Sequence, residues 1–326
     1  QQGLYRRIIQ EDGPIEWMTF WAFVVAGGLA FAALRSRQRP GHFMGRLYLL
    51  AFGIGALAVA TEEISWGQRL IGYQPPEAFL AENFQQEFNL HNLAGTDTRK
   101  TMLLGLLAGF GVLFPLLGRL PPLAGWFESW SVPVPAPGLI PGFAVLIGFY
   151  VSYPFESTGE WVELGAGVGF ACAALRYPQQ LGWSSQWGLA TLPFLLGVIT
   201  PYLLMPAADP ERIAMAEAET RALAADLTSR RLRSRCGVHK RVYTFIEEYG
   251  SGDLSRGAWG KLAPVAEAEA LRRQYFLDPW NLPYWIRHRC SGGRTTAVFV
   301  YSFGPNRRRD SDPGEIREDD IGAYAR

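Results

Sequence analysis

The sequence predicts a protein of two unlike domains: an all-α bundle of six transmembrane helices, followed by an α+β domain that lies in water. Three observations support this prediction. Six long apolar runs lie between residues 15 and 205, and residues 209–326 contain almost none. Aromatic residues make up 13% of the chain, and many stand at the ends of the apolar runs, as interfacial belts do. A length of 326 residues suits two domains, which we place at residues 1–206 and 207–326.

The six apolar runs are each about 17–20 residues long, near the length that crosses a hydrocarbon core of about 30 Å as a helix. They lie at residues 15–34, 44–63, 101–118, 138–154, 160–176 and 187–205. The fourth and fifth are the least regular, because Pro154 and three glutamates lie between and within them. Glycines recur in several runs, and small side chains allow helices to pack closely in lipid.

Arginine placement predicts which ends of the helices face the cytoplasm, because cytoplasmic loops carry an excess of Lys and Arg. Arg119 and Arg176 follow the third and fifth runs, and Arg6 and Arg7 oppose the resulting orientation but are outnumbered. Further arginines lie between the first two runs, at positions 35, 37, 39 and 46. We therefore expect a multi-pass protein of the bacterial inner membrane whose domain after residue 206 is periplasmic.

Charge balance excludes one class of partner. The chain carries 31 Lys and Arg against 30 Asp and Glu, a net charge of +1. It therefore lacks the basic excess of nucleic-acid-binding proteins. The expected partners are membrane lipid and other membrane-protein subunits, and no nucleic acid.

The three cysteines divide between the two domains. Cys172 lies inside the fifth run, where an apolar thiol is common. Cys236 and Cys290 lie in the external domain, and an oxidising compartment allows them to form a disulfide. The sequence leaves open whether they pair or stay apart, because it shows no geometry.

Acidic residues collect at the outer ends of the expected helices, where charged groups are costly and often functional. The candidate metal ligands or acid–base groups of this cluster are Glu62, Glu63, Glu87, His91, Glu156, Glu160 and Glu163. A structural interpretation stands beside the chemical one. Ser157 and Glu160 fit a capping box at a helix start, and the remaining groups then pack helix ends together or contact a partner.

The domain after residue 206 is expected to begin with a helix and end with strands. Asp209 and Pro210 suit the N-cap and first position of a helix, and residues 210–233 are rich in strong helix formers. A second short helix is expected at 264–274. Two β-branched and aromatic runs, 284–289 and 295–303, flank a Ser-Gly-Gly turn, which predicts a hairpin.

The external domain resembles a known family. The run FLDPWNLPY at 276–284 is similar to the DPWGNPY signature of type II secretion major pseudopilins, and the strand at 298–304 is similar to the family's strand ending in Ser-Leu-Gly. The resemblance covers about residues 210–322 and implies a long α-helix packed on a small antiparallel sheet. It also implies a calcium-binding loop whose candidate ligands are Asn306, Asp310, Asp312, Asp319 and Asp320. The segment from Glu62 to Asn92 resembles uncharacterised bacterial polytopic membrane proteins, which implies no particular activity.

The chain departs from the pseudopilin pattern in two ways. Six expected spans replace the single N-terminal hydrophobic helix that pseudopilins use for polymerisation, so we do not expect a filament. Asn306 stands where the family has its first loop aspartate, and Arg307–Arg309 follow it. The loop therefore either binds calcium through its aspartates and the Phe303 carbonyl, or is a solvated loop whose arginines neutralise its acids.

The sequence contains no phosphate-binding glycine loop, paired-histidine zinc motif or serine-nucleophile elbow. Our leading hypothesis is a non-enzymatic accessory or scaffolding subunit of a larger bacterial membrane complex, with the pseudopilin-like domain as an outward-facing interaction module. The alternative is a metal-dependent integral membrane enzyme that uses the outer-face cluster on a lipid-linked or periplasmic substrate. A third hypothesis is a secretion-system component. Convergence of Glu62, Glu63, Glu87, His91 and Glu156 around one metal would favour the enzyme.

Overall fold

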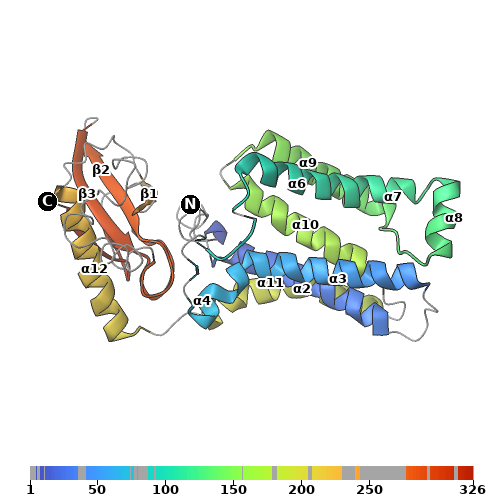
Figure 1. Ribbon diagram of the computed structural model, residues 1–326, viewed down its shortest axis with the longest axis horizontal. Helices are drawn as coiled ribbons and strands as arrows, with labels where there is room; N and C mark the ends of the chain where they lie inside the picture. Colours follow the sequence, from blue (N-terminus) through green and yellow to red (C-terminus); the bar gives the residue numbers. More distant parts are fainter. Residues whose placement is uncertain are drawn as a thin grey trace. The chain divides into compact units, whose positions relative to one another are not determined.

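The protein is mostly helical, with a small antiparallel sheet near its C-terminus (Figure 1). The computed structural model describes residues 5, 8–10, 12–35, 42–73, 75–76, 79, 87–91, 93–155, 157–177, 182–204, 208–229, 239–242, 277–291, 294–311 and 315–325.

The chain forms two compact units that are not simply its two halves. One contains residues 1–66 and 89–203, and the other contains residues 67–88 and 204–326. The chain therefore passes between the units three times. The domain boundary predicted at residue 206 lies near the last of these passages, and the first two were not predicted.

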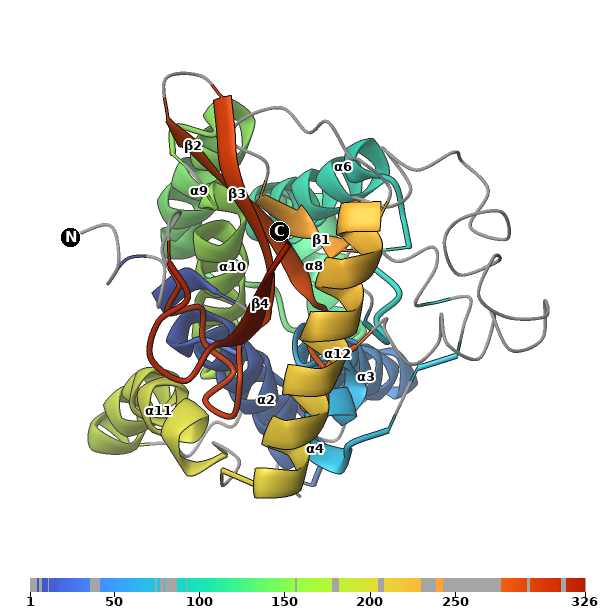
Figure 2. The ribbon, with the colours of Figure 1, turned by 90° about the vertical axis from the view of Figure 1, so that its left-hand side faces the viewer.

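Helix α2 is the centre of the helical unit and packs against α3, α10 and α11, while α6 packs on α9 (Figure 2). The α-helices of this unit are α2 (Pro14–Arg35), α3 (Phe43–Glu63), α6 (Thr96–Ala108), α7 (Phe114–Leu117), α8 (Pro121–Ser129), α9 (Ile140–Ser152), α10 (Thr158–Ala174) and α11 (Trp183–Leu203). The π-helical segment η2 (Gly109–Leu113) joins α6 to α7, and the 3-10 turn η3 (Pro137–Leu139) precedes α9.

Aromatic rings and glycines bring these helices close together. Phe110 stacks on Phe170 with ring centroids 4.1 Å apart. Phe143 packs against two glycines: a Cβ added at Gly111 would lie 2.0 Å from Phe143, and one added at Gly169 would lie 2.6 Å from it. Both distances are shorter than real Cβ contacts, so a larger residue at either position would displace the Phe143 ring. This is the close packing through small residues that the sequence predicted.

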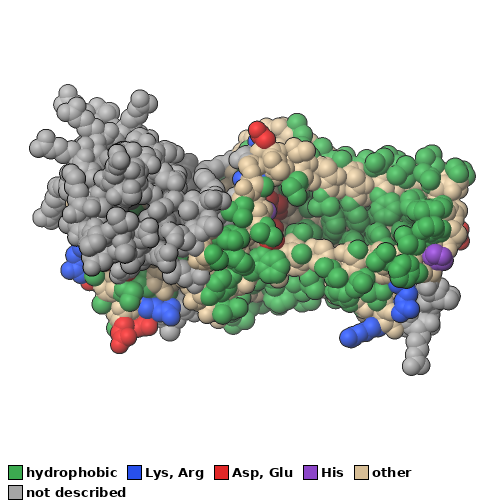
Figure 3. Space-filling model, viewed as in Figure 1, with side chains coloured by type: hydrophobic (Ala, Val, Ile, Leu, Met, Phe, Trp, Pro, Cys, Tyr) green, Lys and Arg blue, Asp and Glu red, His purple; other side chains and the backbone are tan. Residues whose placement is uncertain are grey.

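Helices occupy all six positions predicted from the apolar runs. Within the described ranges, three helices are long and apolar enough to cross a membrane: Pro14–Arg35, Phe43–Glu63 and Asp97–Leu117. The apolar helix over Pro137–Ser152 is shorter. Large apolar side chains stay exposed along several helices, including Ile54, Met102, Val151 and Leu195 (Figure 3). These features are those of a membrane protein, whereas the number of six spans remains a prediction.

In the C-terminal unit, helix α12 (Pro210–Ser229) packs on strands β3 and β4 of a four-stranded antiparallel sheet. The strands, in spatial order, are β1 (His239–Arg241), β2 (Trp285–Ser291), β3 (Arg294–Ser302) and β4 (Ile321–Ala325). Asp209 caps α12 as predicted, since its Oδ1 accepts the Glu211 N–H at 3.0 Å. The predicted hairpin is β2–β3, with Ser291 opposite Arg294. The helix expected at 264–274 lies outside the described residues.

The core of this unit is aromatic. Trp280, Leu282, Phe299 and Tyr301 are fully buried. A helix packed on a small antiparallel sheet is the arrangement that the pseudopilin resemblance implied, although many unrelated domains share such an arrangement.

Candidate functional site

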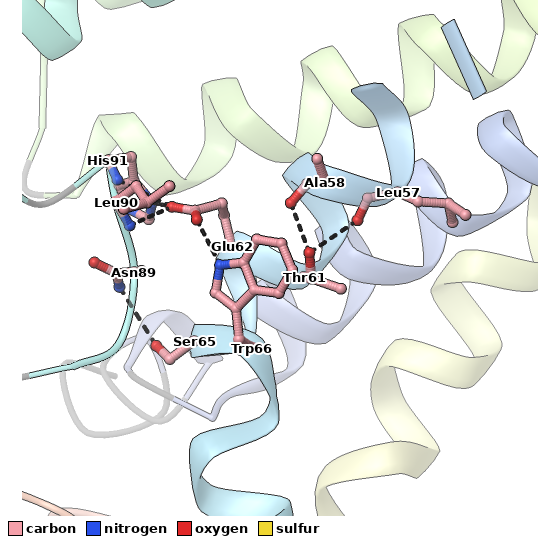
Figure 4. Close-up of polar contacts among 9 residues, drawn as sticks. All are labelled: Leu57, Ala58, Thr61, Glu62, Ser65, Trp66, Asn89, Leu90 and His91. Carbon is pink, nitrogen blue, oxygen red and sulfur yellow. Dashed lines mark hydrogen bonds and ion pairs between the residues drawn. The ribbon is translucent and has the colours of Figure 1, made fainter. Parts of the chain in front are cut away.

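Glu62, in the last turn of α3, is the centre of a hydrogen-bond network (Figure 4). Its Oε2 accepts the backbone N–H groups of Leu90 and His91 at 2.7 and 3.0 Å and lies 3.2 Å from His91 Nδ1. Its Oε1 accepts Trp66 Nε1–H at 2.6 Å. The carboxylate thereby holds the returning segment 89–91 against the end of α3.

The chain is shaped for this network directly after α3. Ser65 and Trp66 adopt positive φ angles of 48° and 53°, and Gly67 follows at 75°. This left-handed turn folds the Trp66 indole back onto Glu62, one helical turn earlier (Figure 4). Asn89 Nδ2 donates to Ser65 Oγ at 3.4 Å, so a second contact fastens the returning segment.

A second group of carboxylates lies beside this network. Glu63 is close enough to Glu62, Glu160 and Glu163 for their negative charges to repel one another. Arg99 supplies attraction to Glu163. Carboxylates of α3 and α10 therefore lie near one another, and their role as ligands or acid–base groups stays a prediction. Glu156 lies outside the described residues.

Glu87 does not join that cluster. It is part of the C-terminal unit and forms a buried ion pair with Arg69, whose side chain is 3% exposed. Gln68 Oε1 accepts the Phe88 N–H at 2.8 Å, so two neighbouring contacts join residues 68–69 to residues 87–88. The Arg69 carbonyl accepts a hydrogen bond from Arg307 Nη2 at 2.8 Å. The sequence analysis missed Arg69 and Arg307 because both contacts depend on tertiary folding.

These positions bear on the metal-enzyme hypothesis. Across the described part of the chain, no group of three or more His, Cys, Asp or Glu side chains is arranged to hold a metal ion. The oxygens of Glu62 accept hydrogen bonds, and Glu87 is paired in the other unit. Four of the five residues expected around one metal are described: Glu62 contacts His91 and lies near Glu63, whereas Glu87 is paired in the other unit.

The candidate calcium loop lies between β3 and β4. The Asn306 amide donates to Asp310 Oδ2 at 2.7 Å and also to Asp319 Oδ1, and the Asn306 backbone N–H donates to Asp319 Oδ2 at 2.9 Å. Asp320 Oδ2 accepts the N–H groups of Asp310 and Ser311 at 3.2 and 2.7 Å. Three aspartates and Asn306 are therefore assembled in one loop. Asp312 lies outside the described residues.

Burial and mutual repulsion disfavour the charged forms of the aspartates in this loop. Burial raises the pKa of Asp320 to about 7, and the nearby Asp310 charge adds to this effect. Burial also raises the pKa of Asp319, with Asp310 again contributing repulsion. Asp320 Oδ1 is buried and has no hydrogen-bond partner. The described aspartates of this loop are not arranged to hold a metal ion, so calcium binding here stays a prediction.

The DPW segment supports the start of this loop. Buried Asp278 accepts the N–H groups of Trp280 and Leu282 at 2.9 and 2.8 Å, and it also accepts Ser302 Oγ–H. Ser302 Oγ in turn accepts the N–H of Gly304, which has a φ of 66°. A Cβ at Gly304 would lie 2.1 Å from the Asp319 carbonyl, so the loop can close only over a glycine.

The predicted disulfide would join Cys236 to Cys290. Cys236 and the side chain of Cys290 are not described, so the predicted disulfide stays a prediction. Cys172, in α10, is a free thiol.

Comparison with protein-family models, with curated proteins and with solved structures finds no match for this chain.

Proposed function

We propose that this chain is a non-enzymatic accessory or scaffolding subunit of a larger bacterial membrane complex. Its helical unit spans the inner membrane six times, and its C-terminal unit is an outward-facing, pseudopilin-like module that contacts other subunits. The arginines at positions 35, 46, 119 and 176, which favour this orientation, follow or begin helices at one end of the bundle.

The observation that carries the proposal is the construction of the C-terminal unit. This unit contains residues 67–88, which follow directly after α3 and its terminal turn, as well as residues 204–326. The buried Arg69–Glu87 pair and the Arg307–Arg69 contact hold that segment within the unit. A unit assembled from two separated stretches of the chain is a domain with its own core, which suits an interaction module.

Calcium is proposed as the ligand of the loop between β3 and β4. Its ligands would be Asp310, Asp319, Asp320 and Asn306, with the Phe303 carbonyl. When bound, the ion would supply positive charge that neutralises the aspartates and ties the loop to β4. The unpaired buried oxygen of Asp320 supports this proposal.

The outward orientation can be tested with reporters fused after Arg326. A periplasmic C-terminus makes an alkaline phosphatase fusion active and a green fluorescent protein fusion dark. The opposite pair of results would contradict the proposed topology.

The scaffolding role can be tested by quantitative co-purification from the native membrane in mild detergent. We expect specific membrane-protein partners with the full chain. Arg69→Ala should lose them, because it breaks the buried pair that fastens the C-terminal unit, and Arg221→Ala, which removes an exposed pair on α12, should retain them. Equal recovery with both variants would argue against an interaction role for that unit.

A further inference from the structure

Helix α8 is a short helix that the sequence analysis did not anticipate. In Figure 1 it runs across the end of the bundle, whereas α6 and α7 run along it. Pro121 and Pro122 occupy its first positions, where proline is tolerated because the missing N–H would have no intrahelical partner. At nine residues α8 is too short to cross a bilayer. It contains Trp126, and Trp130 follows it directly.

The two faces of α8 differ. Phe127 packs towards the bundle, with its ring centroid 5.3 Å from that of Phe114. Trp130 stacks on His42 at 5.4 Å, and His42 caps the start of α3. The Trp126 ring packs on that of Trp130 at 4.7 Å and is still 45% exposed, and Leu120, at the N-cap of α8, is 49% exposed. The helix is therefore fixed to the bundle through Phe127 and Trp130, and it leaves much of the Trp126 indole and of the Leu120 side chain exposed.

Basic side chains lie at the same end of the bundle as α8. Arg119 is exposed just before α8. Arg46 is exposed next to Gly45, and a Cβ at Gly45 would lie 2.3 Å from the Ser131 carbonyl that follows α8. Exposed Arg176 precedes Tyr177, whose hydroxyl is 3.0 Å from that of Tyr48 in α3. Figure 3 shows Lys or Arg side chains and a histidine gathered at this end of the bundle.

We propose that α8 lies in the boundary between headgroups and acyl chains of the cytoplasmic leaflet, where it binds anionic phospholipid. Trp126 and Leu120 enter the acyl boundary, and Arg46 and Arg119 bind the phosphate-bearing headgroups. Amphipathic indole rings favour this depth, and the cytoplasmic leaflet attracts basic side chains. Exposed Glu128 is the one described acidic group on α8, and the arginines at this end of the bundle outnumber it. The inference rests on the proposed membrane orientation.

Fluorescence quenching by brominated lipids tests the depth of α8. The full chain is reconstituted into vesicles of phosphatidylethanolamine and phosphatidylglycerol, and the emission of Trp126→Phe is subtracted from that of the wild type. The difference should be quenched most by bromine near the top of the acyl chain and little by aqueous acrylamide. Leu120→Trp in the Trp126→Phe background should restore quenching at the same depth, which provides a second reporter if the first variant is perturbed.

Headgroup preference is measured with bromine placed on phosphatidylglycerol or on phosphatidylethanolamine. Quenching of Trp126 should favour brominated phosphatidylglycerol, and each of Arg46→Gln and Arg119→Gln should reduce that preference by about fivefold. Arg212→Gln on α12 is the control and should leave it unchanged. If acrylamide quenches Trp126 while lipid bromine quenches the other tryptophans, the inference about α8 is wrong and the membrane proposal stands. A chain with no lipid-quenched tryptophan would overturn the membrane proposal itself.

Discussion

Two groups of carboxylates in this protein have similar composition and unlike surroundings. Glu62 accepts hydrogen bonds from Trp66 and from the backbone of Leu90 and His91 with both of its oxygens. Asp320 uses one oxygen for two backbone N–H groups, and its other oxygen is buried without a hydrogen-bond partner. The first carboxylate is occupied in holding a chain segment, and the second retains capacity for a ligand.

Acidic residues that lie near one another therefore do not by themselves define a ligand site. The hydrogen-bond donors around each carboxylate decide whether it can bind a cation. A carboxylate whose oxygens already accept several N–H groups has few lone pairs left for a metal ion. Glu87, like Glu62, has little capacity left for a cation, since Arg69 neutralises it in a buried ion pair. We therefore treat Glu62 and Glu87 as structural and the aspartates between β3 and β4 as candidate ligands.

The largest effect is expected from Arg69→Ala, which leaves the buried Glu87 carboxylate without its ion pair. Removing one partner of a buried pair costs about 3–5 kcal/mol of unfolding free energy. Arg221→Ala removes an exposed pair with Glu217, and its expected cost is below about 0.5 kcal/mol. Thermal unfolding in detergent compares the two variants. Equal melting temperatures would show that Glu87 is not structural.

Stabilisation by calcium should depend on the aspartates between β3 and β4 and not on Glu62. At a free concentration about 100 times its dissociation constant, calcium should stabilise the C-terminal unit by about 2.7 kcal/mol. Asp320→Asn should abolish this gain, whereas Glu62→Gln should leave it intact. Isothermal titration and thermal unfolding measure the effect. A calcium response that survives Asp320→Asn and disappears in Glu62→Gln would reverse our assignment.

Glu62→Ala should destabilise the helical unit by about 2 kcal/mol, because it strands the N–H groups of Leu90 and His91 and the Trp66 indole. Hydrogen exchange at residues 89–91 should rise at the same time. Thr61→Ala, one residue earlier, keeps the network and serves as the control. Unchanged exchange at 89–91 in Glu62→Ala would contradict the structural role.

The smallest effect is a pH dependence of calcium-free protein. Burial raises the pKa of Asp278 to about 6 and that of Asp320 to about 7, so the folded state holds these protons more tightly than the unfolded chain. Their contribution to stability is full at low pH and is lost as pH rises through those values. From about pH 5 to pH 8, the wild type should lose more stability than Asp320→Asn, because only the wild type releases the Asp320 proton from the folded state in this range. Parallel profiles in denaturant melts would refute the burial of Asp320.

The sequence predicted the positions of the six helices because apolar run length and helix length are directly linked. It predicted α12 from Asp209 and Pro210, and the β2–β3 hairpin from its Ser-Gly-Gly turn. It missed α8, because Pro121 and Pro122 are typical of a loop although proline also suits a helix start. Strand β4 was missed as well, because its pairing with β3 depends on the intervening loop.

The candidate site was only partly predictable for the same reason. The proximity of Glu62 to His91 and of Glu63 to Glu163 follows from helix ends that share one side of the bundle. Glu87 is separate from that group because residues 67–88 belong to the other unit, which apolar periodicity does not encode. Arg307 illustrates the limit most clearly, since its partner is the carbonyl of Arg69, far away in the sequence.

The central claim is that this chain works as a subunit whose C-terminal unit holds a partner. The most direct measurement is the native mass of the full chain, extracted from its own membrane with bound lipid, in calcium and after chelation. We predict a heteromeric assembly well above the 36.3 kDa of the chain alone, with partner loss after chelation. A single species at the mass of one chain plus lipid, in both conditions, would contradict the account.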